Sequence, residues 1–540
     1  MAVQYRKNKN ALLFERFADE NLLNVSSAQN YIPLYERFFE LNSSNWQNVT
    51  LYHLYTLTSV VNKMSDNLYT AVVADDKEQE HNVPVFFKYS PLLDPNRYIT
   101  GYYQKSDDVL PVWNSSAPVH PKMNEVNNAA YIDSFFYYLS SRLKQNGFVH
   151  GLDFYGSYLG YKNQFKYVLE DDVDYVLGDD YFRKHHGALF TASVPLPGKQ
   201  SKIAIGDECD IEIEEVVSEG APRAVSEEPH GEPQEEPHGE PHGEPQEEAH
   251  GDHDGDTIPL AQRDDSSSED DSSRSSNSDD NETRSESSFD SSDSSYDVHD
   301  DVFVHIHRFP VQVIAIEACK NTLDSLLDHL SPAELTSCLF QVVMMLITYQ
   351  SVYKFTHNDL HTNNIMYVET EEKVLRYFVE DTAYEVPTFG KIYKIIDFGR
   401  SIYTFEDKKF ASDSFSENGD ATSQYNTEPF FDPSKERLEP NYSFDLCRLA
   451  CSMVDMLPET EEYEQLNQLI EDWCCDDKGR NIVYKRNGEE RYPGFKLYKM
   501  IARTVHKHVP LMQLRRPIFQ QFIIKKKKLK SQTFFDMSKL

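Results

Sequence analysis

Two short segments of the sequence contain carboxylate and amide residues of the kind that bind cations and accept protons. THNDLHTNNIMYV contains Asp359 and Asn364, and KIYKIIDFGRS contains Asp397. A single aspartate in a polar segment is usually solvated or caps a helix, and each segment alone has that ordinary interpretation. Both occur here in order after a long apolar segment. The three residues are therefore candidates for one site that binds a cation and accepts a proton.

These two segments resemble the catalytic motifs of protein kinases. The first resembles H-R-D-L-x-x-x-N and the second resembles D-F-G, entered from a β-type run. The matched positions are His357, Asp359, Leu360 and Asn364, then Asp397, Phe398 and Gly399. The resemblance implies phosphoryl transfer, which depends on positioning and on neutralisation of charge. It implies that Asp397 and Asn364 bind Mg²⁺, and that Asp359 orients the acceptor hydroxyl and takes its proton.

The resemblance also identifies residues that would hold the nucleotide. VPVFFK ends a predicted strand at Lys88, the position of the lysine that contacts the phosphates of ATP; an ordinary strand-end lysine is the alternative. Its acidic partner is expected on the next helix, with Glu125 as the first candidate and Asp133 as the second. In VIAIEACK the resemblance places the gatekeeper at Ile316. The backbone that would contact adenine is Glu317, Ala318 and Cys319.

Further matches lie in the C-terminal half of the chain. EPNYSFDLCRL contains Asp445, the aspartate that would brace the catalytic loop, and Arg516-Pro517 resembles the R-P element near the end of the kinase domain. The resemblance covers residues 51–199 and 302–524. The segment FASDSFSENGDATSQYNTEPFFDPSKERLEPNYSFDLCRL is similar to serine/threonine-like kinases of large nucleocytoplasmic DNA viruses.

The resemblance implies an ATP- and Mg²⁺-dependent enzyme that phosphorylates Ser or Thr of protein substrates. The expected location is the host-cell cytoplasm, with the nucleus and the virion as alternatives. A pseudokinase scaffold is an alternative function. A second alternative is a kinase-fold enzyme that phosphorylates a small molecule, because H-x-D-L-H-x-x-N also resembles those families.

Four features depart from the kinase pattern. The predicted turn in TSVVNKMSDNLYTAVV contains no glycine, so the backbone is expected to approach phosphates less closely there. Asn358 replaces the usual arginine, which would clamp a phosphorylated activation segment, so no activating phosphorylation of that segment is expected. Asp359 and Asp397 are 38 positions apart, which predicts a lengthened hairpin between them. No clear A-P-E follows, although Glu428-Pro429 and Glu439-Pro440 are candidates.

The expected fold class is α+β, a bilobal protein-kinase-like fold. Its small lobe would be an antiparallel sheet with one main helix, and its larger lobe mainly helical. Strands are expected from Leu51 to Pro91, a helix around residues 124–144, and a hairpin over residues 154–170. The predicted regions are a helical extension (1–50), two small-lobe parts (51–200 and 302–320, the latter including the hinge), an acidic insertion (201–301), a large lobe (321–524) and a basic tail (525–540).

Charge is concentrated in the predicted insertion. Of the net charge of −36, residues 201–300 carry 32 acidic against 5 basic residues, whereas the other 440 residues carry 57 against 48. The Pro/Gly/Glu repeat and Ser/Asp tract of this region are too polar to fold, which predicts disorder. Its histidines could bind metal, but a solvated spacer is the favoured interpretation. A basic partner, self-inhibition of a basic substrate groove and a simple spacer remain alternative roles.

The overall composition excludes several other classes of protein. The chain has 540 residues, 39% hydrophobic and 13% aromatic, enough for a large core. Its acidity argues against direct binding of nucleic acid or of a membrane surface. Seven scattered cysteines without a C-x-x-C spacing indicate reduced thiols, and no signal peptide is evident. The apolar run Leu335–Tyr353 contains Gln341 and Gln350, which favours a buried helix over a membrane span. KKKK at residues 525–528 is either a nuclear-type signal or a solvated tail.

Overall fold

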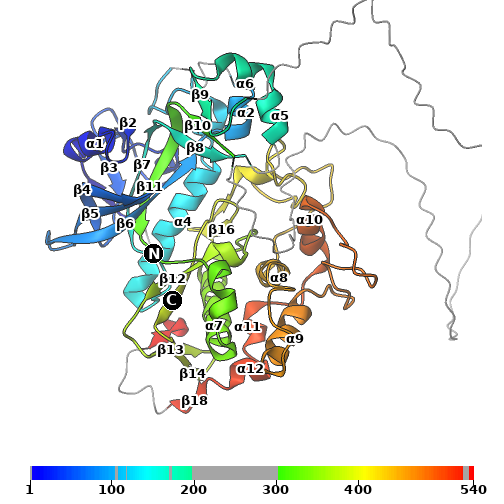
Figure 1. Cartoon of the computed structure of the whole chain (residues 1–540). Helices are drawn as coiled ribbons and strands as arrows, with labels where there is room; N and C mark the ends of the chain where they lie inside the picture. The colour runs from blue at the N-terminus through cyan, green and yellow to red at the C-terminus, as the bar shows by residue number, and fades with distance from the viewer. Residues whose placement is uncertain (1–2, 104–107, 117, 170–172, 197–301, 527–533) are drawn as a thin grey trace, which may run out of the picture. The chain divides into compact units, whose positions relative to one another are not determined.

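The computed structural model describes residues 3–103, 108–116, 118–169, 173–196, 302–526 and 534–540. These residues form a mixed α+β structure that contains several antiparallel sheets (Figure 1). The predicted acidic insertion, residues 201–301, lies outside the described residues, as do Lys527 and Lys528 of the KKKK run.

The largest sheet has six strands in the order β2-β7-β11-β6-β5-β4, all paired antiparallel. The strands are β2 (Val25–Gln29), β4 (Thr56–Ser65), β5 (Leu68–Ala74), β6 (Glu80–Pro91), β7 (Phe154–Lys162) and β11 (Phe309–Glu317). The predicted meander is confirmed as β4, β5 and β6. Strand β11 joins it from the far side of the insertion, so the sheet is built from both parts of the chain.

The prediction of a helical extension over residues 1–50 is wrong for most of its length. Helix α1 spans only Ala11–Ala18, with Leu13 and Phe17 buried. Strand β2 then extends the main sheet along the edge of β7. The region also contains a two-stranded sheet and a 3₁₀ helix: β1 (Tyr5–Lys7) pairs with β3 (Val49–Leu51), and η1 spans Pro33–Arg37. The apolar spacing that suggested a longer helix extends over only two helical turns, and strand pairing determines the conformation of the residues beyond them.

The segment 154–170 forms two strands, but they do not form the expected hairpin. Both edges of β7 are occupied, by β2 on one side and β11 on the other. Strand β8 (Phe165–Val168) therefore pairs with β10 (Phe303–Ile306), which also pairs with β9 (Phe190–Ala192). The result is a separate three-stranded sheet, in the order β8-β10-β9.

Helix α4 (Ala129–Leu143) packs against β7 and β11 of the main sheet (Figure 1). The Asn128 side chain accepts a hydrogen bond from Ala130 N at 3.0 Å and so caps the helix. All its residues except Ala129 and Arg142 are buried. The helix predicted around 124–144 is thus confirmed with a later start. Four short helices flank this part of the chain: α2 (Pro95–Ile99), α3 (Pro121–Asn124), α5 (Val173–Gly178) and α6 (Asp180–His185).

Helix α7 (Pro332–Tyr353) is the longest helix among the described residues. It starts with a capping box in which Ser331 and Glu334 satisfy each other's backbone N–H groups, and Pro332 is its first residue. Among the described segments it is the one helix that is long and apolar enough to cross a membrane. However, 89% of its most apolar 18-residue stretch is buried within the structure. Its apolar surface is therefore already covered by protein, in agreement with the buried-helix interpretation.

The lengthened hairpin between Asp359 and Asp397 is confirmed. Strand β12 (Ile365–Glu369) pairs with β15 (Lys391–Ile395), which keeps the two flanking segments adjacent. The extra residues form a second ladder, β13 (Val374–Val379) with β14 (Thr382–Pro387). The strands β13 and β14 thus lengthen the far end of the hairpin, while β12 and β15 remain paired at its base.

Residues 534–540, at the end of the predicted basic tail, pack against the rest of the structure. Strand β18 (Ile523–Ile524) pairs with β14, and β19 (Phe535–Asp536) pairs in parallel with β13. The Phe535 ring is buried and lies 5.2 Å from the Phe148 ring, centroid to centroid. Apolar burial of Phe535 therefore anchors residues 534–540.

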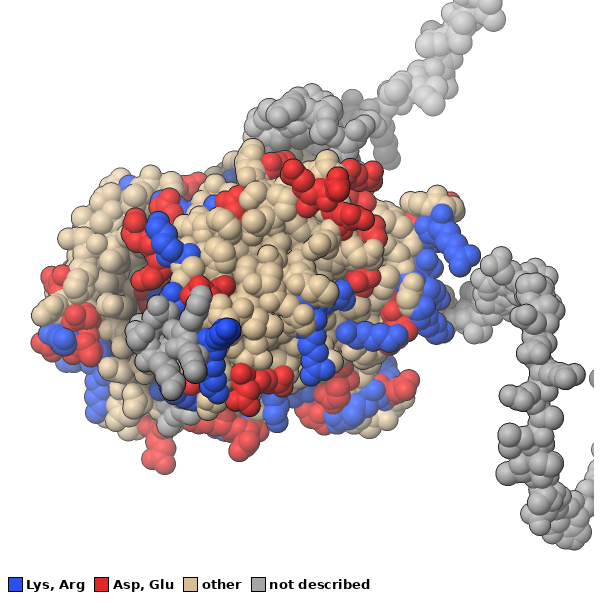
Figure 2. Space-filling view, turned by 90° about the horizontal axis from the view of Figure 1, so that it is seen from below, with Lys and Arg blue, Asp and Glu red and all other residues tan. Residues whose placement is uncertain are grey.

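The remaining elements come after Asp397 in the chain. They are β16 (Ile402–Phe405), β17 (Lys408–Ala411), α8 (Phe444–Cys451), α9 (Glu464–Trp473), α10 (Phe495–Thr504), α11 (Pro510–Gln513) and α12 (Pro517–Gln520). On the face seen in Figure 2, basic and acidic residues are interspersed around a largely uncharged centre. This mixture agrees with the nearly balanced charge of the chain outside the insertion.

Candidate active site

Lys88, on β6, contacts two carboxylates that come from distant parts of the chain. Its Nζ lies 2.7 Å from Asp133 Oδ2 and 2.8 Å from Asp397 Oδ1. Asp133 belongs to the buried helix α4, and Asp397 lies just after β15. Because α4 packs on the sheet that contains β6, the helix brings Asp133 directly to the lysine. The ammonium group therefore links the sheet, α4 and the D-F-G segment.

The prediction that Glu125 pairs with Lys88 is wrong, and the second candidate, Asp133, makes the contact. Glu125 lies at the C-terminal end of α3, before α4 begins. Its Oε1 accepts hydrogen bonds from the backbone and side-chain nitrogens of Asn127, at 2.9 and 3.0 Å. A residue outside α4 does not share the helix face that packs on β6, and Asp133 does.

The charges of these three groups are mutually dependent. Burial raises the pKa of Asp133, and Lys88 opposes that shift. Burial also acts to raise the pKa of Asp397, but the ammonium of Lys88 outweighs it and lowers the value to about 2. Burial likewise acts to lower the pKa of Lys88, and the two carboxylates outweigh it and raise the value well above normal. Asp397 is therefore anionic at neutral pH, as a cation ligand must be.

Asp397 has an unusual backbone conformation that α4 stabilises. Its φ is 61°, in the left-handed region that few non-glycine residues adopt. Asp397 N donates to the Tyr137 hydroxyl at 2.9 Å, and Phe398 N donates to Asp133 Oδ1 at 2.8 Å. The Phe398 ring is buried against Phe136 and Tyr137, with centroids 4.6 and 4.8 Å apart. The Asp397 side chain remains half exposed, at 50%.

Asp445, on α8, braces the loop that contains His357 and Asp359. Its two carboxylate oxygens accept hydrogen bonds from His357 N and Asn358 N, both at 2.9 Å. Burial raises the pKa of Asp445 to about 7, although these two N–H donors act to lower it. His357 Nε2 lies 2.9 Å from Ile396 O, and its Nδ1 lies 3.3 Å from Asp359 N. The ring thus connects this loop to the residue that precedes Asp397.

Asn364 connects the same loop to the D-F-G segment. Its Nδ2 donates to Asp359 O at 2.9 Å and lies 3.0 Å from His361 Nε2. Ile396 N donates to Asn364 O at 3.0 Å. Both side-chain hydrogen bonds use the amide nitrogen, and in the described segments none is present at the amide oxygen. That oxygen is the atom that a magnesium ion would use.

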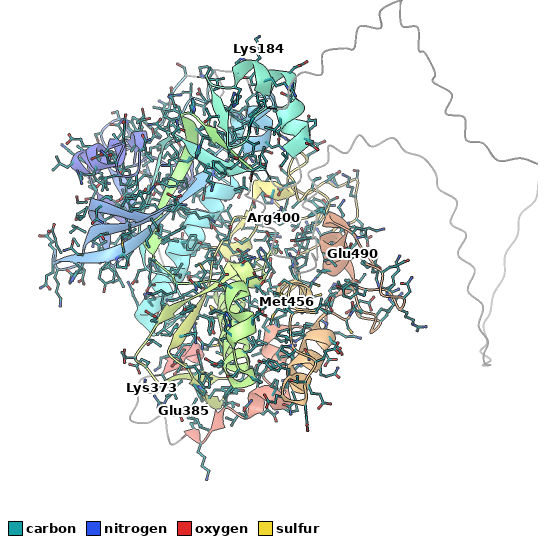
Figure 3. All side chains as sticks on the ribbon, viewed as in Figure 1. Lys184, Lys373, Glu385, Arg400, Met456 and Glu490 are labelled. Atoms are coloured by element: carbon teal, nitrogen blue, oxygen red, sulfur yellow. The ribbon has the colours of Figure 1, made fainter. Side chains whose placement is uncertain are left out.

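The Asp359 carboxylate has two partners that sequence reasoning missed. Tyr498, on α10, donates its hydroxyl to Oδ1 at 2.8 Å, and Arg400 Nη1 lies 3.6 Å from Oδ2. Arg400 also pairs with Asp420, Nη2 to Oδ2, at 2.5 Å, and Figure 3 shows it in the centre of the structure. Burial acts to raise the pKa of Asp359, but Arg400 and Arg448 outweigh it and lower the value. Arg400 directly follows the matched D-F-G, whereas Tyr498 has no local signal in the sequence.

The predicted hinge lies at the end of β11. Ile316 is the penultimate residue of the strand, and Glu317 is the last. Glu317 N donates to Asp153 O at 2.9 Å, and its carboxylate lies 3.4 Å from Lys394 Nζ, so this side chain has a structural role. Among the described residues, no hydrogen-bond partner is present for the backbone N–H groups of Ala318 and Cys319. Those two groups are the ones that could contact a base edge.

Asn358, at the position of the missing arginine, is fully buried and bonded to the segment after Asp397. Its Nδ2 donates to Arg400 O at 3.0 Å, and its Oδ1 accepts from the Tyr425 hydroxyl at 2.9 Å. A neutral side chain therefore makes a contact that needs no phosphate. Arg516 lies elsewhere, at the start of α12, where Nη1 is 2.8 Å from Asp472 Oδ2 of α9.

The glycine-free turn between β4 and β5 is a tight connection at Asp66 and Asn67. Asn67 has a φ of 62°, so it adopts the conformation that usually favours glycine. Pairing between the two strands is interrupted by three register shifts, the last at Lys63–Ser65. Bulges of this kind bend a strand, and here they shape the hairpin in place of glycines.

The residues present fit magnesium held jointly with a nucleotide. In the described ranges, no group of three or more His, Cys, Asp or Glu side chains could hold a metal alone. Magnesium commonly uses only one or two protein ligands together with phosphate oxygens, so Asp397 and Asn364 are sufficient. Two small cavities of about 10 Å³ each lie near His53 and Phe154, and neither is lined by these residues.

No protein-family model matches the chain and no curated protein matches its sequence, so any assignment of function depends on the residues of this site and their contacts.

Proposed function

We propose that the chain is an ATP- and Mg²⁺-dependent protein kinase that phosphorylates Ser or Thr of protein substrates. The observation that carries the proposal is the position of Lys88 between Asp133 and Asp397. Phosphoryl transfer by kinases needs a lysine paired with a helical carboxylate and a D-F-G aspartate placed to hold magnesium. Here both carboxylates lie beside Lys88. Asp133 takes the place of the usual glutamate.

Each residue has a distinct task in this proposal. ATP supplies the γ-phosphoryl group, and Lys88 binds its phosphates. Asp397 and Asn364 Oδ1 bind magnesium, and Asp397 is anionic because Lys88 lowers its pKa. Asp359 orients the acceptor hydroxyl and takes its proton, and its lowered pKa keeps it ionised for that step. The free N–H groups of Ala318 and Cys319 suit contacts to adenine.

The proposal includes a bilobal kinase fold. The six-stranded sheet with α4 corresponds to the smaller lobe, and α7 to α12 with their hairpins correspond to the larger. The strand β11 leads into the predicted hinge between them. The similarity to kinases of large DNA viruses belongs to the same proposal, since it depends on the same motifs.

A pseudokinase scaffold is the second candidate function. It is favoured by the contacts at Asp359, because Tyr498 and Arg400 already occupy the carboxylate that a substrate hydroxyl would need. The turn at Asn67 also favours a scaffold, because without glycine its backbone is expected to approach phosphates less closely. A scaffold would retain the Lys88 contacts for stability and would transfer no phosphate.

The test uses the full-length purified chain with γ-labelled ATP, Mg²⁺, a mixture of proteins and a mixture of small metabolites. We expect labelled Ser and Thr in proteins, and a loss of at least 100-fold in Asp397→Asn. The matched control is Asp381→Asn, whose side chain is 94% exposed in the turn between β13 and β14. Equal labelling by Asp381→Asn and wild type excludes a general effect of losing one carboxylate.

The other outcomes distinguish the alternatives. If no labelling occurs and nucleotide with magnesium does not raise the melting temperature, the enzyme proposal is wrong and the scaffold stands. If only small molecules are labelled, the chain is a small-molecule kinase.

A further inference from the structure

The Tyr498 hydroxyl is bonded to Asp359 in the way that a substrate hydroxyl would be. The distance between Tyr498 Oη and Asp359 Oδ1 is 2.8 Å, and the hydroxyl is the donor. Among the described residues, no other hydroxyl group is hydrogen-bonded to this carboxylate. Burial raises the pKa of Tyr498, so the phenol keeps its proton at neutral pH until a base removes it. The proposed base is already in contact with it.

We propose that Tyr498 is a phosphorylation site of this chain and that the chain phosphorylates it intramolecularly. This inference depends on the proposed kinase function. Tyr498 Oη attacks the γ-phosphorus of ATP, and a new O–P bond forms as the bond from that phosphorus to the β,γ-bridging oxygen breaks. The bond electrons leave with ADP, and the phenol proton passes to the Asp359 carboxylate.

The tether explains how a tyrosine could serve in a site that otherwise acts on Ser or Thr. Helix α10 holds Tyr498 next to the Asp359 carboxylate, which is the proposed proton acceptor. The effective concentration of this acceptor hydroxyl therefore far exceeds that of a free peptide. Recognition of a peptide sequence is then unnecessary. The absence of a clear A-P-E motif does not affect this step, because the acceptor arrives by folding.

The surroundings of Tyr498 can accommodate the product. The guanidinium carbons of Arg448 and Arg400 lie 5.0 and 5.8 Å from the centre of the Tyr498 ring. A phosphate on Oη carries nearly two negative charges, which repel Asp359 and attract these arginines. We therefore expect phosphorylation to break the Tyr498–Asp359 hydrogen bond and to free the carboxylate for other acceptors.

The experiment compares wild type, Tyr498→Phe and Tyr492→Phe in full-length protein after incubation with ATP and Mg²⁺. Tyr492 lies six residues earlier in the same segment and serves as the matched control. Mass spectrometry locates phosphate on each chain, and labelling of an added protein substrate is measured in the same tube. We expect phosphate on Tyr498 in wild type and Tyr492→Phe, at a rate independent of protein concentration. A tagged Asp397→Asn chain mixed with wild type should acquire none at Tyr498.

Three results would overturn the inference. Labelling of the added substrate without phosphate on Tyr498 would leave the kinase function intact and show that Tyr498 only blocks the acceptor position; higher substrate labelling by Tyr498→Phe would support that role. Phosphate on Tyr498 of the tagged Asp397→Asn chain would show transfer between molecules. Absence of all labelling, with no thermal shift by nucleotide, would reject the kinase function and this site with it.

Discussion

Lys88 Nζ and Asp397 Oδ1 lie 2.8 Å apart although 309 positions separate them in the sequence. The contact joins β6 of the main sheet to the segment after β15, and Asp133 of α4 is the third partner. Asp133 is nearly inaccessible at 2% exposure, whereas Asp397 is half exposed. The lysine therefore has two different functions: it compensates a buried charge on one side and leaves a carboxylate available to a ligand on the other.

Removing the ammonium group should destabilise the protein through Asp133. Lys88→Met leaves a buried carboxylate without its cation, and we expect a loss of about 3 kcal/mol in the free energy of unfolding. Urea denaturation followed by circular dichroism measures it. The double variant Lys88→Met/Asp133→Asn should recover part of the loss, because it leaves no buried charge. Lys63→Met is the control: its partner Asp66 is 85% exposed, and we expect a change below about 1 kcal/mol. A double variant no more stable than Lys88→Met would contradict this explanation.

Asp413 should control the position of α4. Its Oδ1 accepts from Ala129 N, in the first turn of α4, at 2.9 Å, and its Oδ2 pairs with Lys122 at 2.5 Å. Asp413→Ala removes both contacts and should cost about 2 kcal/mol of stability. Because α4 also carries Asp133, we expect weaker nucleotide binding, measured by titration calorimetry. Asp432→Ala, in an exposed turn, should leave that affinity unchanged. Unaltered affinity in Asp413→Ala would show that the sheet alone positions α4.

Stability should depend on pH through Asp445. Burial raises its pKa in the folded state to about 7, above its value in the unfolded chain, so the folded protein binds the extra proton. The stability gained from that proton is complete below the unfolded pKa of roughly 4 and is lost as pH rises through about 7. Relative to Asp445→Asn, wild type should therefore lose more than about 1 kcal/mol between pH 4.5 and 7.5. Urea denaturation at four pH values tests this. A relative gain instead would mean that the two N–H donors keep the carboxylate ionised.

Activity should not require phosphorylation of the segment after Asp397. Asn358 is buried, uncharged and bonded to Arg400 O and Tyr425, so a phosphate has no arginine of this loop to bind. Between Ser401 and Tyr425, the exposed hydroxyl residues are Thr422 and Ser423. We expect Thr422→Ala/Ser423→Ala to keep at least half of the wild-type transfer rate, with Tm unchanged. A loss of 10-fold or more in a protein of normal Tm would show that phosphorylation there is needed.

Local sequence was sufficient for the elements whose signals are local. The meander of β4 to β6 is predictable from alternating apolar residues between polar turns, and α7 from an apolar run that starts at Ser331 and Pro332. The residues of the loop His357–Asn364 and of the D-F-G segment were identifiable because their residue types and order match two known motifs. The pairing of β12 with β15 at the base of the lengthened hairpin was predictable, because these strands lie directly next to the two motifs in the sequence.

Only the tertiary structure decided which residues meet. It selected Asp133 over Glu125, because helix packing on β6 determines which side chain reaches Lys88. It separated β8 from β7, because neighbouring strands already occupied both edges of β7. It also brought Tyr498 to Asp359 across 139 positions, a contact that no sequence motif predicts. Periodicity and spacing describe the chain one segment at a time, whereas the contents of the site depend on packing between segments.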